Sequence, residues 1–304
     1  MIGISEIGYY LPENSISNYD RLAEFNLNTD FIEKKSGFKR LTKCHENETT
    51  SQMCVRSFND LLSKIDINKD QIDCCIVITQ NPDYKLPHVS AIVHKEIGLN
   101  ENCACFDISL GCSGYVYGLS VIKSFMESNN LINGLLFTSD PYSKIIDIND
   151  KSTSLLFGDG ATVTLIKENP KYEIKKFTFG TIGDSYSDLL CSHKLEMNGR
   201  GIFAFASRKV PLDIKLVLNK NGLEISEIDL FIIHQGSKFI IDTIREKLMI
   251  SEEKMRFYAS DYGNLISSSI PMILKDHLST RKDKILLSGF GVGLSWSSTV
   301  LIKT

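Results

Sequence analysis

The feature that most constrains the fold is a pattern of residues that occurs twice, about 150 residues apart. Residues 70–80 and 226–235 each carry a short acidic loop, then an apolar run, then a polar exit. Residues 134–139 parallel 284–289 in the same way, and further strand-like runs follow them at 157–166 and 293–302. A repeat of this size indicates two similar α/β halves rather than a stack of short units.

Helical patterns alternate with these strands. Apolar residues three or four positions apart predict helices at residues 50–63, 89–97, 114–127, 210–219 and 239–248. The runs at 74–78 and 230–233 are continuously apolar, as is typical of strands that are covered on both faces. We therefore expect an α/β fold with a covered sheet, in two halves (residues 1–168 and 169–304) that meet around Pro170.

Composition excludes several classes of protein. The chain has 34 basic and 37 acidic residues, so no basic excess indicates binding to a nucleic acid or a membrane surface. No apolar run approaches the roughly 20 residues of a membrane span, and the N-terminal residues lack the pattern of a signal peptide. The eight cysteines include no C-x-x-C pair. We expect a cytoplasmic protein with reduced cysteines and no bound metal.

Cys112 stands between a strand-like run, 104–108, and a helical pattern that begins at Gly114. Unpaired N–H groups and the dipole at a helix N-terminus favour a thiolate over a thiol. We therefore expect a lowered thiol pKa and a nucleophilic cysteine at this position. Considered alone, this stretch is equally compatible with a small cysteine buried in a tight turn.

Three further positions favour a catalytic site. His234 ends a buried strand, where a polar side chain can enter a site, although a structural histidine is the alternative. Asn264 follows Gly263, a pair that also suits an ordinary turn. Glycines alternate through residues 289–293 after another strand. Such glycines let the backbone approach a ligand, and a bulge or tight turn would use them as well.

In this order, the segments resemble the β-ketoacyl-acyl carrier protein synthase III family of the thiolase superfamily over nearly the whole chain. The resemblance is carried by residues 106–114, 157–161, 234–235, 262–264 and 289–296. It implies a thiolase-like fold, in which two pseudo-repeated α/β halves form a layered αβαβα sandwich. It also implies a decarboxylative Claisen condensation. An acyl thioester acylates Cys112, and a malonyl thioester then loses CO₂ and attacks the acyl group to give a β-ketoacyl thioester.

The same resemblance implies a role for particular residues. Cys112, His234 and Asn264 would form the catalytic triad, and the loop of Gly291, Val292 and Gly293 would bind the oxyanion. Thioesters of coenzyme A or of acyl carrier protein would be the substrates, without a cofactor. The implied substrate-binding residues are Phe31, Lys35, Ser36, Lys151, Gly199 and Ser237. In a homodimer, Leu86 would cap the acyl pocket of the partner.

Some positions depart from the family pattern. Phe31 stands where Trp is usual, and Lys35 and Lys151 stand where Arg is usual, so we expect an altered grip on coenzyme A. Phe239 replaces an Arg that helps to dock the carrier protein. Two alternatives therefore stay open. The protein could transfer an acyl group to an alcohol or amine, a reaction for which Asn264 has no evident use, or it could be an inactive partner subunit, which would have no need of Cys112.

Overall fold

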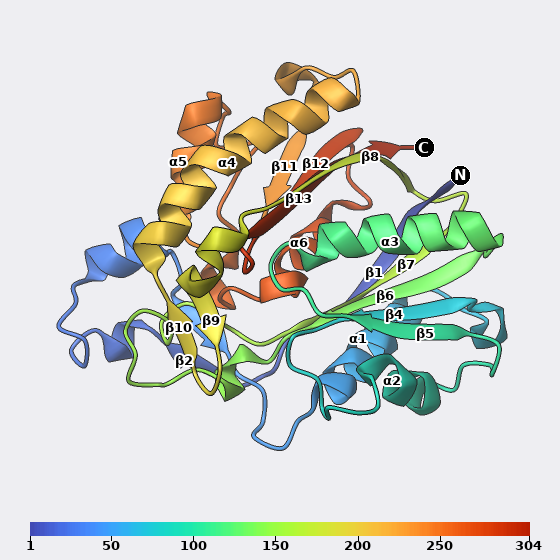
Figure 1. The fold of residues 1–304 in the computed structure, drawn as a ribbon, viewed down its shortest axis with the longest axis horizontal. Helices are drawn as coiled ribbons and strands as arrows, with labels where there is room; N and C mark the ends of the chain where they lie inside the picture. The colour runs from blue at the N-terminus through green and yellow to red at the C-terminus, as the bar shows by residue number, and fades with distance from the viewer.

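The computed structural model describes residues 1–304 and contains one large sheet with helices on both faces (Figure 1). Its strands are β1 (Ile2–Tyr10), β4 (Cys74–Ile78), β5 (Ala104–Ile108), β6 (Asn133–Ser139), β7 (Ala161–Glu168), β8 (Tyr172–Thr181), β11 (Leu230–Ile233), β12 (Lys284–Gly291) and β13 (Ser295–Lys303). The helices are α1 (Thr50–Lys64), α2 (Val89–Ile97), α3 (Gly114–Asn129), α4 (Gly199–Lys220), α5 (Lys238–Leu248) and α6 (Ser269–Leu274). Two small sheets pair β2 (Ser15–Ser17) with β3 (Arg40–Thr42) and β9 (Leu189–Cys191) with β10 (Leu195–Met197).

The order of strands confirms the predicted repeat. The nine-stranded sheet runs β11-β12-β13-β8-β1-β7-β6-β4-β5. In the first half, β4 is parallel to β6, while β6–β7 and β7–β1 are antiparallel. In the second half, β11 is parallel to β12, while β12–β13 and β13–β8 are antiparallel. The halves join where β1 pairs with β8, and β5 has no counterpart. The boundary between the halves near residue 168 stays a prediction.

The helices and the two halves of the sheet form five layers, as Figure 1 shows. Helices α1 and α2 cover the outer face of the first half, and α4 and α5 cover the outer face of the second. Helices α3 and α6 lie between the halves, because α3 contacts β4 and β6 on one side and β12 and β13 on the other. The predicted thiolase-like αβαβα fold is therefore confirmed.

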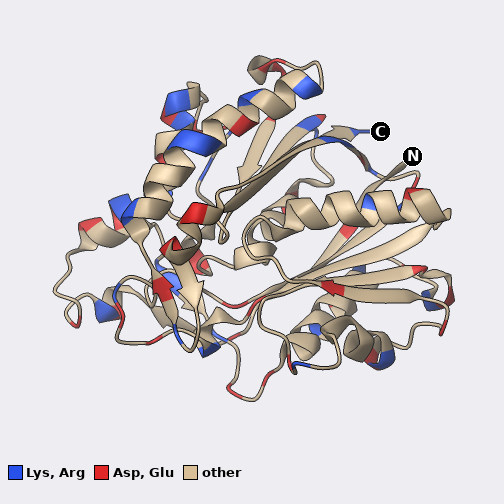
Figure 2. Ribbon diagram, in the orientation of Figure 1, with Lys and Arg blue, Asp and Glu red and all other residues tan.

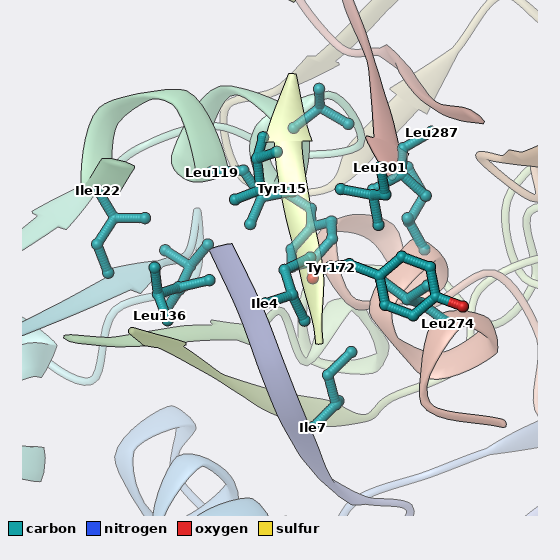
Figure 3. Close-up of a cluster of buried hydrophobic side chains, with 14 of the residues drawn as sticks. Ile4, Ile7, Tyr115, Leu119, Ile122, Leu136, Tyr172, Leu274, Leu287 and Leu301 are labelled. Carbon is teal, nitrogen blue, oxygen red and sulfur yellow. The ribbon is translucent and has the colours of Figure 1, made fainter. Parts of the chain in front are cut away.

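The core around α3 explains why this helix is buried where it faces both halves of the sheet (Figure 3). Ile4, Leu119 and Leu287, from β1, α3 and β12, belong to one cluster and are fully buried. Two tyrosines extend it, and each hydroxyl has a partner: Tyr115 bonds Thr164 Oγ1 at 3.1 Å, and Tyr172 donates to a backbone carbonyl. Buried tyrosine is tolerated when its hydroxyl is paired in this way. The cluster fixes α3, and thereby the loop that precedes it.

The charged residues lie mainly on the outside of the layered fold. In Figure 2, Lys, Arg, Asp and Glu lie mostly on the outer helices and in loops, and the strands between α3 and α4 are largely uncharged. This is the distribution that the cost of burying unpaired charge requires. No helix of the structure has the length and apolar character that a membrane crossing needs.

Two predicted boundaries are wrong. The helix predicted at 210–219 is α4, which begins eleven residues earlier, at Gly199. Gly199, Gly201 and the internal Pro211 obscure its start, because they are poor helix formers. Packing overrides this weakness, since Phe205, Val210 and other apolar residues of α4 are buried against β12, β13 and α5.

The strand predicted at 157–166 is β7, which begins only at Ala161. Its predicted first residue, Phe157, instead forms an isolated parallel bridge with Asn264. Gly158 makes this close approach possible, because a Cβ on it would lie 1.8 Å from a backbone oxygen of Tyr262. The bridge brings the segment after Tyr262 against the first half of the chain.

Candidate active site

A cavity of about 640 Å³ is lined by residues from both halves of the chain. At its inner end lie Cys112, from the loop before α3, and Gly291, at the end of β12. His234, directly after β11, and Asn264, on the segment bridged to Phe157, line the same cavity. Tertiary structure thus brings together the side chains of Cys112, His234 and Asn264, which span 152 residues of the chain.

Cys112 is buried, with 4% of its surface exposed, and it precedes the first residue of α3 by two positions. Burial is the largest influence on its thiol and raises the pKa to about 12. Backbone hydrogen bonds from Val292 and from Cys112 itself lower the pKa, but they do not compensate for burial. The predicted lowering of this pKa is therefore wrong, because desolvation of the thiolate outweighs the helix N-terminus.

The backbone N–H groups of Val292 and Cys112 reach the Cys112 sulfur because the end of β12 passes close to it. Gly291 lies so close to Cys112 that a Cβ on it would be 2.6 Å from Cys112 Cβ and 2.8 Å from Sγ. Only a residue without a side chain therefore lets the β12 end pass beside the thiol. This close approach also brings the N–H of Val292 within bonding reach of the sulfur.

Replacing Gly291 by alanine is expected to displace the Cys112 side chain and to slow its acylation about 100-fold, because a misplacement of about 1 Å has that effect at a reacting centre. The rate of covalent adduct formation, followed by intact-protein mass spectrometry, measures it. Gly236→Ala is the matched control, since Gly236 lines the same cavity and its added Cβ would meet no atom closer than 3.4 Å. Equal rates for the two variants would contradict the prediction.

His234 is held by the backbone and by an aromatic neighbour. Its backbone N–H donates to the carbonyl of Ser288 at 2.9 Å. Its imidazole ring lies edge-on to the ring of Phe290, with centroids 5.5 Å apart. The side-chain Nδ1 is buried and has no hydrogen-bond partner. Burial lowers the pKa of His234 to about 3, and the Ile266 backbone opposes this shift. The imidazole is therefore neutral at physiological pH.

The lowered pKa of His234 predicts a pH dependence of stability. In the unfolded chain a histidine takes up a proton near pH 6.5, whereas His234 in the fold does so only near pH 3. Its contribution to the free energy of unfolding is therefore complete above about pH 6.5 and is lost as the pH falls, by up to about 1.4 kcal/mol per pH unit. Burial raises the pKa of Asp140 to about 6, which gives the opposite slope between about pH 4 and 6.

Comparison with a His234→Gln variant separates the two groups, because Asp140 titrates in both proteins. Urea unfolding at a series of pH values should show a free-energy difference, wild type minus variant, that rises by about 1.4 kcal/mol per pH unit between pH 4 and 6. A difference that does not change with pH would contradict a neutral, buried His234.

The amide of Asn264 has a fixed orientation. Its Oδ1 accepts hydrogen bonds from the N–H of Ile266 at 3.0 Å and from Ser269 Oγ at 3.4 Å, which leaves Nδ2 for the cavity. Ile266 adopts a left-handed conformation, with φ of 52°, which is costly for a β-branched residue. In this conformation its N–H fixes Asn264 while its backbone also interacts with His234. Strain of this kind concentrates at functional sites.

The outer part of the cavity contains every predicted substrate-binding residue: Phe31, Lys35, Ser36, Lys151, Gly199 and Ser237. Lys35 and Lys151 form no ion pair within the chain, and the buried Oγ of Ser36 has no hydrogen-bond partner. Ser237 also caps α5, because its Oγ accepts from the N–H of Ile240. The opening therefore offers unpaired cations and an unpaired hydroxyl to a ligand.

Three predicted residues lie outside the cavity lining. Val292 and Gly293 lie at the turn between β12 and β13, where the Val292 backbone bonds the Cys112 sulfur and its side chain packs against the cluster around Cys112. Leu86 is 86% exposed and lines a separate hollow, together with Tyr84 and His88. Within one chain, Leu86 therefore has no acyl pocket to cap.

Arg21 positions part of this site and is not among the residues predicted from the sequence. Arg21 is buried, and its guanidinium donates to the carbonyls of Ser154 at 3.0 Å and Ile148 at 2.6 Å. These bonds hold the loop that carries Lys151 at the cavity mouth. No local pattern around Arg21 indicates this role, because its partners lie more than 120 residues away.

The fold and the cavity define a protein of the thiolase-like class with a cysteine at the inner end of its cavity. Comparison with known families supports a closer assignment. Residues 106–183 match the family model for 3-oxoacyl-[acyl-carrier-protein (ACP)] synthase III, and residues 218–302 match the model for its C-terminal part. The chain is 32% identical to a β-ketoacyl-[acyl-carrier-protein] synthase III from Lactococcus lactis and 33% identical to one from Streptococcus gordonii, with 98% of each chain covered.

Solved structures agree with this assignment. A crystal structure of β-ketoacyl-[acyl carrier protein] synthase III from Thermus thermophilus superimposes with a TM-score of 0.93 and 31% identity, covering 99% of both chains. The chain therefore belongs to the β-ketoacyl-[acyl-carrier-protein] synthase III family, and it is an enzyme.

Proposed function

We propose that this enzyme catalyses the decarboxylative Claisen condensation of an acyl thioester with a malonyl thioester. The observation that carries the proposal is that Cys112, His234, Asn264 and Gly291 line one cavity. Family membership supports it, because the relatives are named as synthases of this kind. The substrates are thioesters of coenzyme A or acyl carrier protein, and no further cofactor takes part.

In the first step, the sulfur of Cys112 attacks the carbonyl carbon of the acyl thioester. The carbon–sulfur bond to the carrier breaks, the acyl–Cys112 bond forms, and the thiol proton leaves with the released carrier thiol. The backbone N–H groups of Cys112 and Val292 form hydrogen bonds to the Cys112 sulfur, so they are placed to bind the oxyanion that develops beside it. Because burial disfavours a free thiolate, we infer that proton loss accompanies the attack.

In the second step, the malonyl thioester loses CO₂, and the electron pair of the broken bond forms an enolate. A neutral His234 and the Nδ2 of Asn264 donate hydrogen bonds to the enolate oxygen. The enolate carbon attacks the acyl group, a β-ketoacyl thioester forms, and the Cys112 sulfur leaves as a thiolate that takes up a proton from solvent. Asn264 suits this role because its amide donates without titrating.

We further infer that the enzyme is a homodimer. Strand β5 ends the sheet with one edge unpaired, and the neighbouring loop exposes Leu86 and Tyr84. An exposed strand edge beside apolar side chains favours pairing with a second copy. Light scattering coupled to gel filtration tests the dimer. A cytoplasmic location is consistent with all eight cysteines being free, since the reaction requires a reduced thiol.

The function is tested by offering acyl thioesters to the full-length protein and measuring the mass of the product. The expected result is one acyl group on Cys112, followed by CO₂ release and a free β-ketoacyl product after addition of malonyl carrier. Transfer of the acyl group to an alcohol or amine without CO₂ release would overturn the proposal. Absence of any adduct would overturn it as well.

A further inference from the structure

Asp140 is a fully buried carboxylate that the proposed mechanism leaves without a role. It directly follows β6, and no basic side chain forms an ion pair with it. Its Oδ1 accepts hydrogen bonds from the backbone N–H of Gln80 at 2.7 Å and from Thr79 Oγ1 at 3.4 Å. Its Oδ2 accepts from Ser267 Oγ at 2.5 Å, and the backbone N–H of Ser267 adds a further bond. A buried charge is costly without such partners, so these bonds show which segments the carboxylate connects.

One side of the carboxylate holds the loop beside the nucleophile. A Cβ on Gly111 would lie 2.5 Å from Gln80 Oε1, so Gln80 packs directly against the backbone that precedes Cys112. Asp140 itself is near the thiol, because its negative charge is the second influence, after burial, that raises the pKa of Cys112. Asp140 therefore lies within electrostatic reach of the reacting sulfur, although it does not line the cavity.

The other side of the carboxylate holds the segment that orients the two enolate donors. Ser267 follows Ile266, whose backbone N–H fixes the Asn264 amide and whose backbone also interacts with His234. Ile266 keeps its left-handed conformation only because its surroundings hold it there, since that conformation is unfavourable for a β-branched residue. The bonds from Ser267 to Asp140 begin one residue after this strained position.

We propose that Asp140 is a positioning residue for the second step of the reaction. Its carboxylate holds Ile266 and Ser267 in place, so that Asn264 and His234 donate to the enolate oxygen in the correct direction. Asp140 does not line the cavity, and it acts through the backbone of the short 3-10 helix Ile266–Ser268. The inference rests on the proposed function, in which these two side chains stabilise the enolate.

The role requires a carboxylate and not merely a side chain of the same shape. Both oxygens of a carboxylate accept, so Asp140 serves Gln80 on one side and Ser267 on the other. An asparagine at this position has one acceptor oxygen and one NH₂ group. The Ser267 hydroxyl can turn to accept from that NH₂ group, but the backbone N–H groups of Gln80 and Ser267 cannot. In Asp140→Asn, one of the two segments therefore loses its partner and shifts.

Protonation of Asp140 has the same effect as this substitution, because a neutral carboxyl group also turns one acceptor into a donor. Burial raises the pKa of Asp140 to about 6. The titratable groups around it keep one state near that pH. Burial raises the pKa of Cys112 to about 12, places those of Cys54 and Tyr142 well above their usual range, and lowers that of His234 to about 3. Decarboxylation is therefore expected to fall below about pH 6, by about tenfold per pH unit, until it reaches the rate of Asp140→Asn.

The test measures two rates on the full chain: CO₂ release from malonyl-N-acetylcysteamine and acylation of Cys112 by acetyl-N-acetylcysteamine. These thioesters carry no nucleotide phosphate and no protein, so no substrate group titrates near about pH 6. For Asp140→Asn at about pH 8, we expect CO₂ release to fall about 100-fold, because a misplacement of about 1 Å has an effect of that order. Loss of the negative charge favours the Cys112 thiolate and offsets part of any displacement of the sulfur. The ratio of CO₂ release to acylation should therefore fall at least about tenfold.

Asp213→Asn is the matched control, because it makes the same change at another buried carboxylate. Asp213 lies on α4, its Oδ2 accepts from Ser298 Oγ at 2.6 Å, and burial raises its pKa as well. It does not line the cavity. We expect this variant to keep the ratio and the pH profile of the wild type. The same fall of the ratio in the control would contradict a specific role of Asp140.

Ser267→Ala tests the connection itself, because it removes only the hydroxyl that donates to Oδ2 of Asp140. We expect it to lower CO₂ release about tenfold, as for the loss of one hydrogen bond to a charged group. The double variant Asp140→Asn, Ser267→Ala should be no slower than Asp140→Asn alone, because both substitutions release the same segment. If the two losses multiplied, Asp140 would not act through Ser267 and the inference would be wrong.

The segment stays attached to β6 when the bonds to Asp140 are lost, because Ser268 Oγ also bonds Thr138 Oγ1 at 2.8 Å. Circular dichroism and thermal melting establish the folding of each variant. If Asp140→Asn does not fold, the pH profile of the wild type and the Ser267→Ala variant test the inference without it.

Equal losses of CO₂ release and acylation in a folded Asp140→Asn protein would indicate a general structural role and overturn the inference. A wild type whose CO₂ release stays constant between about pH 8 and about pH 5 would overturn it as well. A wild type that neither releases CO₂ nor forms the acyl adduct is a different result and refutes the proposed function itself.

Discussion

Replacing Cys112 by serine is expected to abolish the acyl-enzyme and to lower condensation by at least about 10³-fold. A serine hydroxyl is a far weaker nucleophile than a cysteine sulfur, and the buried site lowers its reactivity further. Intact-protein mass spectrometry after incubation with an acyl thioester measures the adduct, and release of β-ketoacyl product measures condensation.

The matched control is Cys191→Ser, which makes the same chemical change at an exposed cysteine on β9. We expect this control to form the adduct at the rate of the wild type. A Cys112→Ser protein that condenses substrates at an undiminished rate, or an acyl group found on Cys191, would contradict the assignment of the nucleophile.

Replacing Asn264 by aspartate is expected to lower malonyl decarboxylation and condensation by about 10²–10³-fold, while the acyl adduct on Cys112 still forms. The substitution preserves size but removes the Nδ2 donor and places a carboxylate where the enolate charge develops. His234→Ala should affect the same step, because it removes the other donor. Release of CO₂ from a malonyl thioester measures this step separately from acylation.

Asn102→Asp serves as the control for added negative charge, since Asn102 is exposed in a turn before β5. We expect it to decarboxylate malonyl thioester normally. If Asn264→Asp lost acylation and decarboxylation to the same extent, Asn264 would have a general structural role instead of a role in the second step.

Much of the fold follows from the sequence, since the relevant patterns are local. The strands Cys74–Ile78, Ala104–Ile108 and Leu230–Ile233 are found where the apolar runs predict them, and α2 occupies its predicted residues. The predictions are wrong where packing overrides propensity, as in α4, which continues through Gly201 and Pro211. They are also wrong where a tertiary bridge replaces a strand, as at Phe157.

For the candidate site, the sequence predicts which residues take part but not their chemical state. Motifs and their resemblance to a family identify Cys112, His234 and Asn264 as candidates, and the structure places all three on one cavity. The state of the thiol is a different matter, because the helix N-terminus before Gly114 predicts a lowered pKa, whereas burial raises it to about 12. The left-handed conformation of Ile266, which fixes the Asn264 amide, has no sequence signal at all.

The sequence by itself determined the duplicated α/β layers and the residue types that are available for chemistry. Hydrophobic period, strand length and duplication are properties of neighbouring residues, so they can be read along the chain. Only the tertiary structure decided the environment of the site: the buried thiol, the neutral imidazole and the orientation of the Asn264 amide. Desolvation and a fixed side-chain orientation arise from contacts between residues far apart in the chain, and these contacts exist only after the two halves have folded against each other.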